Sequence, residues 1–95
     1  MPKQQFTEFK KITQEMYDLH VRKNNDYSAG SIDNISSLGE KALFVRIFDK
    51  CCRLLSLVWT EKDRKVKDES IDDTILDLAV YSIIWIIYRR GKWGK

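Results

Sequence analysis

The chain has 95 residues, of which 43% are hydrophobic and 33% charged, and its formal net charge is +3. These values predict one soluble globular domain over residues 1–95 and argue against a disordered chain. The weak positive charge gives no case for binding duplex nucleic acid, although it suits a small anionic ligand.

A first helix is predicted by apolar residues that recur at three- and four-residue spacing and end near Asn24. Residues 25–39 are rich in Ser, Asn, Asp and Gly, which predicts a long loop. The run KNNDYS, residues 23–28, lies at this boundary. It either simply ends the helix or offers hydrogen-bonding groups and an aromatic ring to a polar ligand. The apolar stripe comprises Phe6, Phe9, Ile12, Met16 and Leu19.

A second helix is predicted after Gly39, with an apolar stripe and a charged stripe on nearly opposite faces. Three cations around one carboxylate can hold a phosphate group. Spacing alone favours the simpler interpretation of a solvated face with helical ion pairs. The apolar stripe comprises Phe44, Ile47, Phe48, Cys51, Leu54, Leu55 and Val58, and the charged stripe comprises Arg46, Asp49, Lys50 and Arg53.

Two observations predict the compartment of the protein. Cys51 and Cys52 are the only cysteines, and adjacent cysteines predict free thiols of a cytosolic protein, with neither a disulfide nor a zinc site. The first residues, MPKQQFTEFKK, lack the apolar core of a signal peptide. We therefore expect a cytoplasmic protein.

A third helix is predicted from about DESIDDT to Arg90, with Ser70 or Asp68 as its N-cap. From Val80 onward it is apolar on nearly every side and must be covered on every side. The predicted fold is therefore an all-α, three-helix domain with a long loop between helices 1 and 2. We expect it to form a homo-oligomer (dimer, tetramer or hexamer) through the third helix; the alternative is a compact monomer whose loop covers that helix. The apolar run of residues 78–88 is shorter than the roughly 20 residues of a membrane span.

Glu69, Asp73 and Asp77 follow four-residue steps on the third helix, so their like charges repel. Mg²⁺, the helix dipole or the charged stripe of the second helix can offset this repulsion. Asp77 lies too deep in the helix for the dipole to reach. We therefore predict that it pairs with a cation of the charged stripe, and we favour ion pairing over a metal site.

The runs KNNDYS, RIFDKCCRL and VKDESIDDTILDLAVYSI together resemble a phage and bacterial family, the first nucleotide modification associated domain. The resemblance extends over roughly residues 20–85. The family commonly has Trp or Gly after the tyrosine of the first motif, whereas this chain has Ser28 and Ala29. The matching residues are Lys23, Asn24, Asp26, Tyr27, Arg46, Asp49, Lys50, Arg53, Asp68, Glu69, Ser70, Asp73, Thr74, Asp77, Leu78 and Tyr81.

This resemblance implies an all-helical, phage-encoded nucleotide-binding protein of the host bacterial cytosol. Relatives include oligomeric sponges that sequester the cyclic nucleotide signals of antiphage immunity, such as cyclic dinucleotides. Such a site needs cations for the phosphates and polar groups and an aromatic ring for the bases. The ligand-binding residues that we predict are Lys23, Asn24, Asp26, Tyr27, Arg46, Asp49, Lys50, Arg53, Asp73 and Tyr81.

A looser similarity to the MazG-type nucleotide pyrophosphatases provides an alternative function. It implies a magnesium-dependent enzyme with Glu69, Asp73 and Asp77 as metal ligands; an accessory protein of nucleotide modification is a further alternative. Those enzymes hold Mg²⁺ with an E-x-x-E motif on one helix and an acidic pair on the next. Here the first motif reads Arg46-x-x-Asp49, so half of its carboxylates are missing. We therefore favour binding without cleavage and without a metal cofactor.

Overall fold

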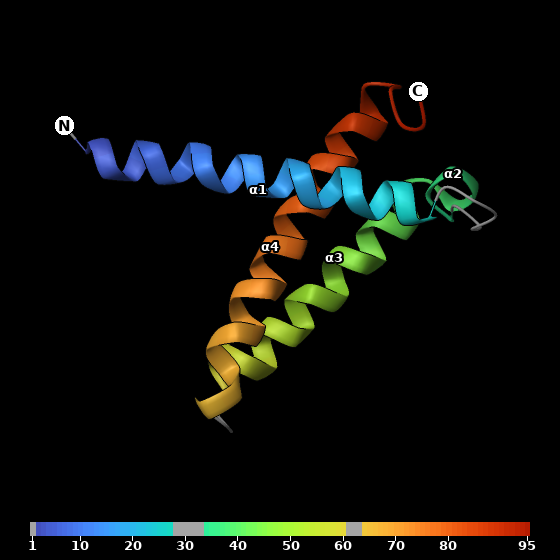
Figure 1. Cartoon of the computed structure of the whole chain (residues 1–95). Coiled ribbons are helices and arrows are strands. Elements are labelled where there is room, and N and C mark those ends of the chain that lie inside the picture. The colour runs from blue at the N-terminus through green and yellow to red at the C-terminus, as the bar shows by residue number, and fades with distance from the viewer. Residues whose placement is uncertain (1, 28–33, 61–63) are drawn as a thin grey trace. The chain divides into compact units, whose positions relative to one another are not determined.

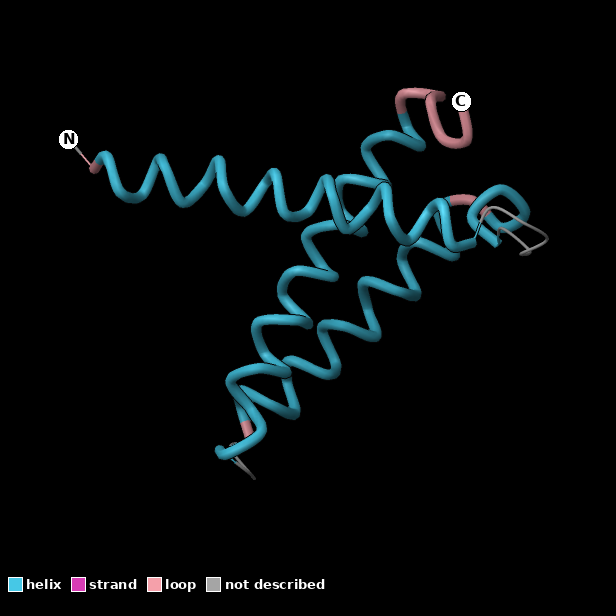
Figure 2. The backbone as a smooth tube through the Cα atoms, in the orientation of Figure 1, coloured by secondary structure: helices cyan, strands magenta, loops and turns pink. Residues whose placement is uncertain are grey.

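The computed structural model describes residues 2–27, 34–60 and 64–95, and these residues form helices and short turns with no strand (Figure 2). The all-α prediction is confirmed, although four α-helices replace the predicted three within these ranges. The elements are α1 (Lys3–Tyr27), α2 (Asn34–Leu38), α3 (Glu40–Leu54), a π-helical turn η1 (Leu55–Trp59) and α4 (Arg64–Arg89) (Figure 1).

The chain divides into two units, residues 1–32 and residues 33–95. In its described part the first unit is the single helix α1, which runs to Tyr27 and not to the predicted end near Asn24. No Gly or Pro interrupts this segment, and extending an existing helix by one residue is easy compared with nucleating it. A lone helix has no core, so the apolar stripe of α1 has no partner among the described residues of its own unit.

The second unit contains α2, α3, η1 and α4. The predicted loop over residues 25–39 is wrong at both ends, because residues 25–27 belong to α1 and residues 34–38 form α2. Burial of Ile35, which is only 6% exposed, outweighs the weak helix propensity of the Ser- and Asn-rich run around it. The middle of the predicted loop lies outside the described residues.

A small core joins the three helices of the second unit. Its centre is Leu43 of α3, which is fully buried, packed with Ile35 of α2 and Ile84 of α4. The surrounding, partly buried side chains come from α4 and from the chain after it, and they are Val80, Tyr81, Trp85, Tyr88 and Trp93. Because most of these side chains are aromatic, a short hairpin of helices obtains a core from few residues.

Gly39 makes the sharp turn between α2 and α3 possible. Its backbone lies at φ 65° and ψ −136°, a region that residues with a side chain rarely adopt. Its N–H donates to the carbonyl of Ile35 at 2.8 Å. A Cβ atom at this position would lie 2.7 Å from the hydroxyl oxygen of Tyr88. Both the backbone conformation and the close approach of α4 therefore require glycine.

The helix α4 starts earlier than its predicted caps. It begins at Arg64, so Asp68 and Ser70 lie inside the helix and neither is its N-cap. The residues between this start and Asp68 are mostly Arg and Lys, which are good helix formers, and no Gly or Pro separates them from the rest of the helix.

The end of α4 agrees with the prediction. Gly91 lies at φ 70°, and its N–H donates to the carbonyl of Tyr88 at 3.0 Å. The N–H of Lys92 donates to the carbonyl of Ile87 at 3.1 Å. These two bonds form a Schellman motif, which ends the helix at Arg89. In the described part of the chain, neither α4 nor any other helix combines the length and apolarity that crossing a membrane requires.

Candidate functional site

The helices α3 and α4 lie side by side and run in opposite directions (Figure 1). The two helices are in an antiparallel register, in which a residue further along α3 faces an earlier residue of α4. Gly39, just before α3, lies beside Tyr88, and Leu43 packs in the core with Ile84. One and two turns further along α3, Arg46 lies over Tyr81 and Lys50 pairs with Asp77, which continues this register. The helix pair is therefore apolar toward the α2 end and polar toward the η1 end.

We call the polar half of this contact the polar seam. It comprises Arg46, Lys50 and Arg53 of α3 with Thr74, Asp77 and Tyr81 of α4. In the first of its pairs the guanidinium carbon of Arg46 lies 5.7 Å from the centroid of the Tyr81 ring, within the range of a cation–π contact. This contact orients the guanidinium against α4.

The second pair joins Lys50 Nζ to Asp77 Oδ2 at 3.2 Å. The prediction that Asp77 pairs with a cation of the charged stripe is confirmed. The two side chains are 28% and 27% exposed, so the pair is partly shielded from water while its edge remains accessible. A metal ion at Asp77 would have to displace the ammonium group of Lys50.

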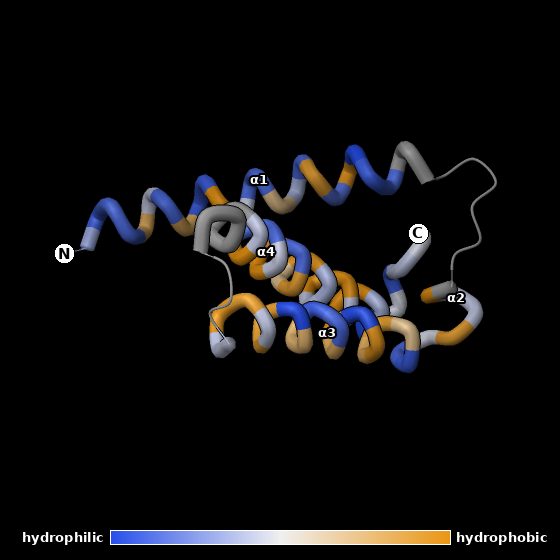
Figure 3. Tube along the Cα trace, turned by 90° about the horizontal axis from the view of Figure 1, so that it is seen from below, coloured by the Kyte–Doolittle hydropathy of each residue, from blue (hydrophilic) through white to orange (hydrophobic). Residues whose placement is uncertain are grey.

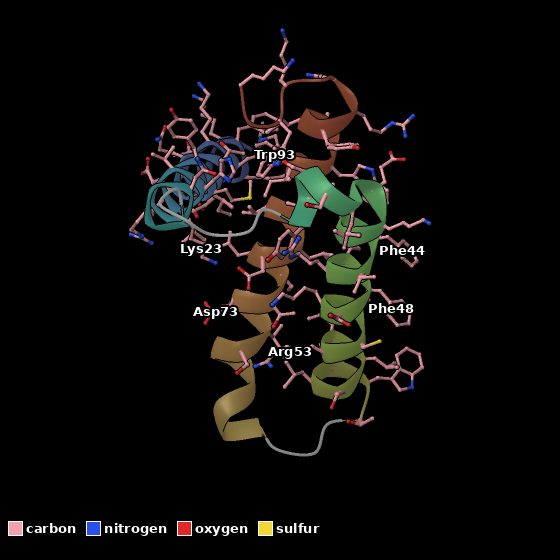
Figure 4. All side chains as sticks on the ribbon, turned by 90° about the vertical axis from the view of Figure 1, so that its right-hand side faces the viewer. Lys23, Phe44, Phe48, Arg53, Asp73 and Trp93 are labelled. Atoms are coloured by element: carbon pink, nitrogen blue, oxygen red, sulfur yellow. The ribbon has the colours of Figure 1, made fainter. Side chains whose placement is uncertain are left out.

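The register places Arg53 opposite Thr74. The side chain of Arg53 is exposed and extends from α3 toward α4 (Figure 4). It makes no hydrogen bond or ion pair within the described residues. Thr74 is only 3% exposed, and its hydroxyl donates to the carbonyl of Ser70 at 2.6 Å, so this hydroxyl is used inside α4. Arg53 is therefore a cation at the end of the polar seam that can accept a ligand without breaking an existing contact.

The orientation of α3 agrees only in part with what amphipathicity predicts, because Leu43 is buried while other apolar residues are exposed. A helix of a globular protein usually turns its apolar face to the core and its charged face to water. Here Phe44 and Phe48 are each 56% exposed and point away from α4 (Figure 4). The tube of α3 carries hydrophilic and hydrophobic residues in alternating patches (Figure 3), and its α4-facing side includes the apolar Leu43 as well as Arg46 and Lys50. Two residues of the predicted solvated face, Arg46 and Lys50, thus contact α4, while Asp49 and Arg53 remain exposed.

The other predicted site residues are not part of the polar seam. Asp49 and Asp73 are exposed on α3 and α4, respectively, outside the line of paired residues. Lys23 and Asn24 are exposed on α1, which belongs to the other unit. Three further residues of the prediction have side chains outside the described residues, namely Asp26, Tyr27 and Glu69.

A second polar cluster was missed by the sequence interpretation. Glu40, in the first turn of α3, accepts a hydrogen bond from Trp85 Nε1 at 2.9 Å and one from Arg89 Nη1 at 2.5 Å. These hydrogen bonds, together with the charge of Arg89, lower the pKa of the Glu40 carboxyl. Four-residue spacing of Trp85 and Arg89 was the signal available in the sequence. The cluster connects the start of α3 to the last turns of α4, and so its role is structural.

Comparison of the chain with protein-family models, curated proteins and solved structures gives no significant match. The functional argument therefore rests on the geometry of the polar seam and on the motif residues that form it. Of those residues, the structure brings together Arg46, Lys50, Asp77 and Tyr81, with Arg53 next to them on the same helix face.

Proposed function

We propose that this protein binds a nucleotide, with the polar seam holding its phosphate groups, and releases it chemically unchanged. The observation that supports this most directly is the exposed guanidinium of Arg53, which lies in line with Lys50 and Arg46 on the α4-facing side of α3. Guanidinium groups bind phosphate through two parallel hydrogen bonds, and an ammonium group adds a point charge.

The three cations have different roles in this proposal. Arg53 contributes the first contact, because it is exposed and uncommitted within the described residues. Lys50 is half-buried beside Asp77 and can share its charge with a phosphate through its accessible edge. Arg46 is held by the ring of Tyr81, and it contributes a fixed positive field behind the other two groups.

Binding is favoured over hydrolysis by the state of the carboxylates. A metal-dependent pyrophosphatase needs several carboxylates that are free to hold Mg²⁺ beside the phosphates. In the polar seam the carboxylate of Asp77 is neutralised by Lys50 at 3.2 Å, and cations outnumber it. Such a site can attract a phosphate but is poorly suited to concentrating metal ions.

The role that we propose is sequestration of a cyclic nucleotide signal of host antiphage defence, as the resemblance described above implies. A cyclic dinucleotide carries two phosphates related by approximate two-fold symmetry, which would suit a site completed by a second copy of the chain. The resemblance implies base recognition by Asn24, Asp26 and Tyr27, but these residues belong to the first unit and are not part of the polar seam.

A thermal-shift screen with mononucleotides and with cyclic di- and trinucleotides tests the proposal. A ligand at 100 times its Kd should stabilise the protein by about 2.7 kcal/mol and raise its melting temperature. Chromatography of the recovered ligand should show it intact. If no nucleotide raises the melting temperature, the proposal is wrong.

Two matched variants locate the site. Arg53→Ala should weaken binding by roughly 10- to 100-fold, because it removes a charge-assisted contact of about 1.5–3 kcal/mol. Lys41→Ala removes a cation that is also exposed on α3 but lies outside the polar seam, and it should bind normally. Equal binding by both variants would remove the polar seam from the proposal. Magnesium-dependent turnover that is lost in Asp73→Ala would instead establish the pyrophosphatase alternative.

A further inference from the structure

The outward face of α3 and η1 carries a continuous apolar strip, which we call the outer stripe: Phe44, Phe48, Cys52, Leu55 and Trp59. Its large side chains are exposed, from 56% for Phe44 to 81% for Trp59. The rings of Phe44 and Phe48 are stacked on each other with centroids 6.1 Å apart, so they present one flat surface. We infer that the outer stripe is the contact surface for a second copy of this chain, related by a two-fold axis.

The uncovered area is the first argument for a protein partner. The three aromatic rings of the outer stripe leave on the order of 400 Å² uncovered at their measured exposures. Leu55 and the neighbouring Val45 and Val58, each more than half exposed, add to it. One partner of a standard interface buries about 800 Å² in total, and a monomer seldom leaves an apolar patch larger than about 300–600 Å². The outer stripe thus supplies most of the apolar surface that one side of a stable dimer needs.

The order of the side chains is the second argument, because it suits pairing with an identical copy. Cys52 lies near the middle of the outer stripe, with bulky side chains on both sides of it. In an antiparallel pair whose axis passes near Cys52, Phe44 would meet the partner subunit's Trp59, and Phe48 would meet the partner subunit's Leu55. The small cysteine side chains at the crossing point would let the two helices approach closely.

The outward face of α4 is a weaker candidate. Ile75, Ile83 and Ile86 are exposed there, but Ser82 interrupts them and no aromatic ring extends the surface. We therefore assign the two-fold contact to α3, where the sequence alone suggested the third helix. This assignment does not depend on the proposed nucleotide site, which lies on the opposite face of α3.

Two variants with matched exposure decide between the helices. Leu55 and Ile86 are aliphatic and 57% and 51% exposed, so a glutamate at either position disturbs the folded monomer to a similar small extent. Light scattering coupled to size exclusion should show that Leu55→Glu halves the mass of the native particle. Ile86→Glu should leave the mass unchanged. Circular dichroism checks that both variants remain helical.

Thiol crosslinking of the native protein provides an independent measurement, since Cys51 and Cys52 are free and exposed. A short bismaleimide should give a covalent dimer at low micromolar concentration, and Cys51→Ser/Cys52→Ser should give none. A native protein with the mass of one chain would overturn the inference, because α1 of the same chain or an unrelated partner would then cover the outer stripe. A folded Leu55→Glu variant with the native mass would overturn it as well.

Discussion

At the scale of single residues, the hairpin of the second unit depends on side chains that touch across its α2 end. Tyr88 lies close to Gly39, since a Cβ built on residue 39 would lie only 2.7 Å from the tyrosine oxygen. The tyrosine thus occupies space that any larger residue at position 39 would need.

We predict that Gly39→Ala destabilises the protein by about 2–4 kcal/mol, the sum of the backbone cost of positive φ and the cost of overpacking against Tyr88. Urea unfolding followed by circular dichroism measures it. Gly91→Ala is the matched control: it shares the positive φ of 70° but meets no atom within 4 Å, so about 1 kcal/mol is expected. Adding Tyr88→Phe to Gly39→Ala should recover part of the loss, and an equal loss in both glycine variants would contradict the contact.

The Glu40 cluster predicts a dependence of stability on pH. The pKa of the Glu40 carboxyl in the folded protein lies below the ordinary value of 4.5, because Trp85 and Arg89 donate hydrogen bonds to the charged carboxylate. The folded state therefore binds fewer protons than the unfolded state in this range, and stability rises with pH. The contribution is fully present above pH 4.5 and is lost as the pH falls through the lower folded pKa.

Glu40→Gln should flatten this part of the profile of melting temperature against pH. The amide keeps an acceptor for Trp85 Nε1 but cannot gain or lose a proton. Arg89→Ala should reduce the dependence in the same direction, whereas Arg90→Ala, which removes an exposed cation next to it, should keep the native profile. A Glu40→Gln profile identical to the native one would show that the cluster does not contribute to acid sensitivity.

At the scale of elements, α3 and α4 are held in register by contacts of two kinds. Toward α2 the contacts are apolar and close, and toward η1 they are the cation–π contact of Arg46 and the ion pair of Lys50 with Asp77. The polar contacts specify the register, because a slip of one helical turn would leave a half-buried carboxylate without its cation.

A double-mutant cycle on Lys50→Ala and Asp77→Ala should give a coupling energy of about 0.5–1 kcal/mol in urea unfolding, because both groups are partly shielded from water. The coupling should decrease in high salt. The same cycle with Lys41→Ala in place of Lys50→Ala should give a value near zero. A zero coupling for the first pair would mean that the pair contributes nothing to the register.

The contact of Arg46 and Lys50 with α4 is the main difference between the prediction of a solvated charged face and the structure at this scale. The periodicity identified two distinct faces and placed Arg46, Lys50 and Arg53 together on one of them. It carried no information on which face meets the neighbouring helix. That choice depends on the complementary residues of α4, Asp77 and Tyr81, and on coverage of the outer stripe.

At the scale of the whole molecule, the small core makes the second unit sensitive to single deletions. Leu43 is the one fully buried large side chain of the described residues. Small domains have a total stability of only about 5–15 kcal/mol, so the loss of one such side chain is a large fraction of the whole.

Leu43→Ala should reduce the free energy of unfolding by about 2–5 kcal/mol, through lost burial and the cavity that remains. Leu38→Ala is the matched control, since Leu38 is 61% exposed on α2, and its effect should stay within about 0.5 kcal/mol. Thermal and urea unfolding measure both. If the two variants were equally stable, Leu43 would not be the centre of the core.

The first unit also has apolar side chains that its own described residues do not cover. Residues 3–27 form one long helix whose apolar stripe has no partner among the described residues of that unit. An isolated helix of this length is marginal in water, and most helical stability in proteins comes from packing of the apolar face.

The sequence by itself determined that the described residues are mainly helical, that α4 stops before Gly91, and that Asp77 pairs with a cation. These features depend on local spacing, on glycine and on an uncompensated charge, all of which are visible in the order of residues. Only the tertiary structure decided that Arg46 and Lys50 of α3 meet α4, that α2 supplies Ile35 to the core, and that Glu40 joins Trp85 and Arg89. Those features depend on which surfaces meet, and the free energy of that choice is shared between residues far apart in the chain.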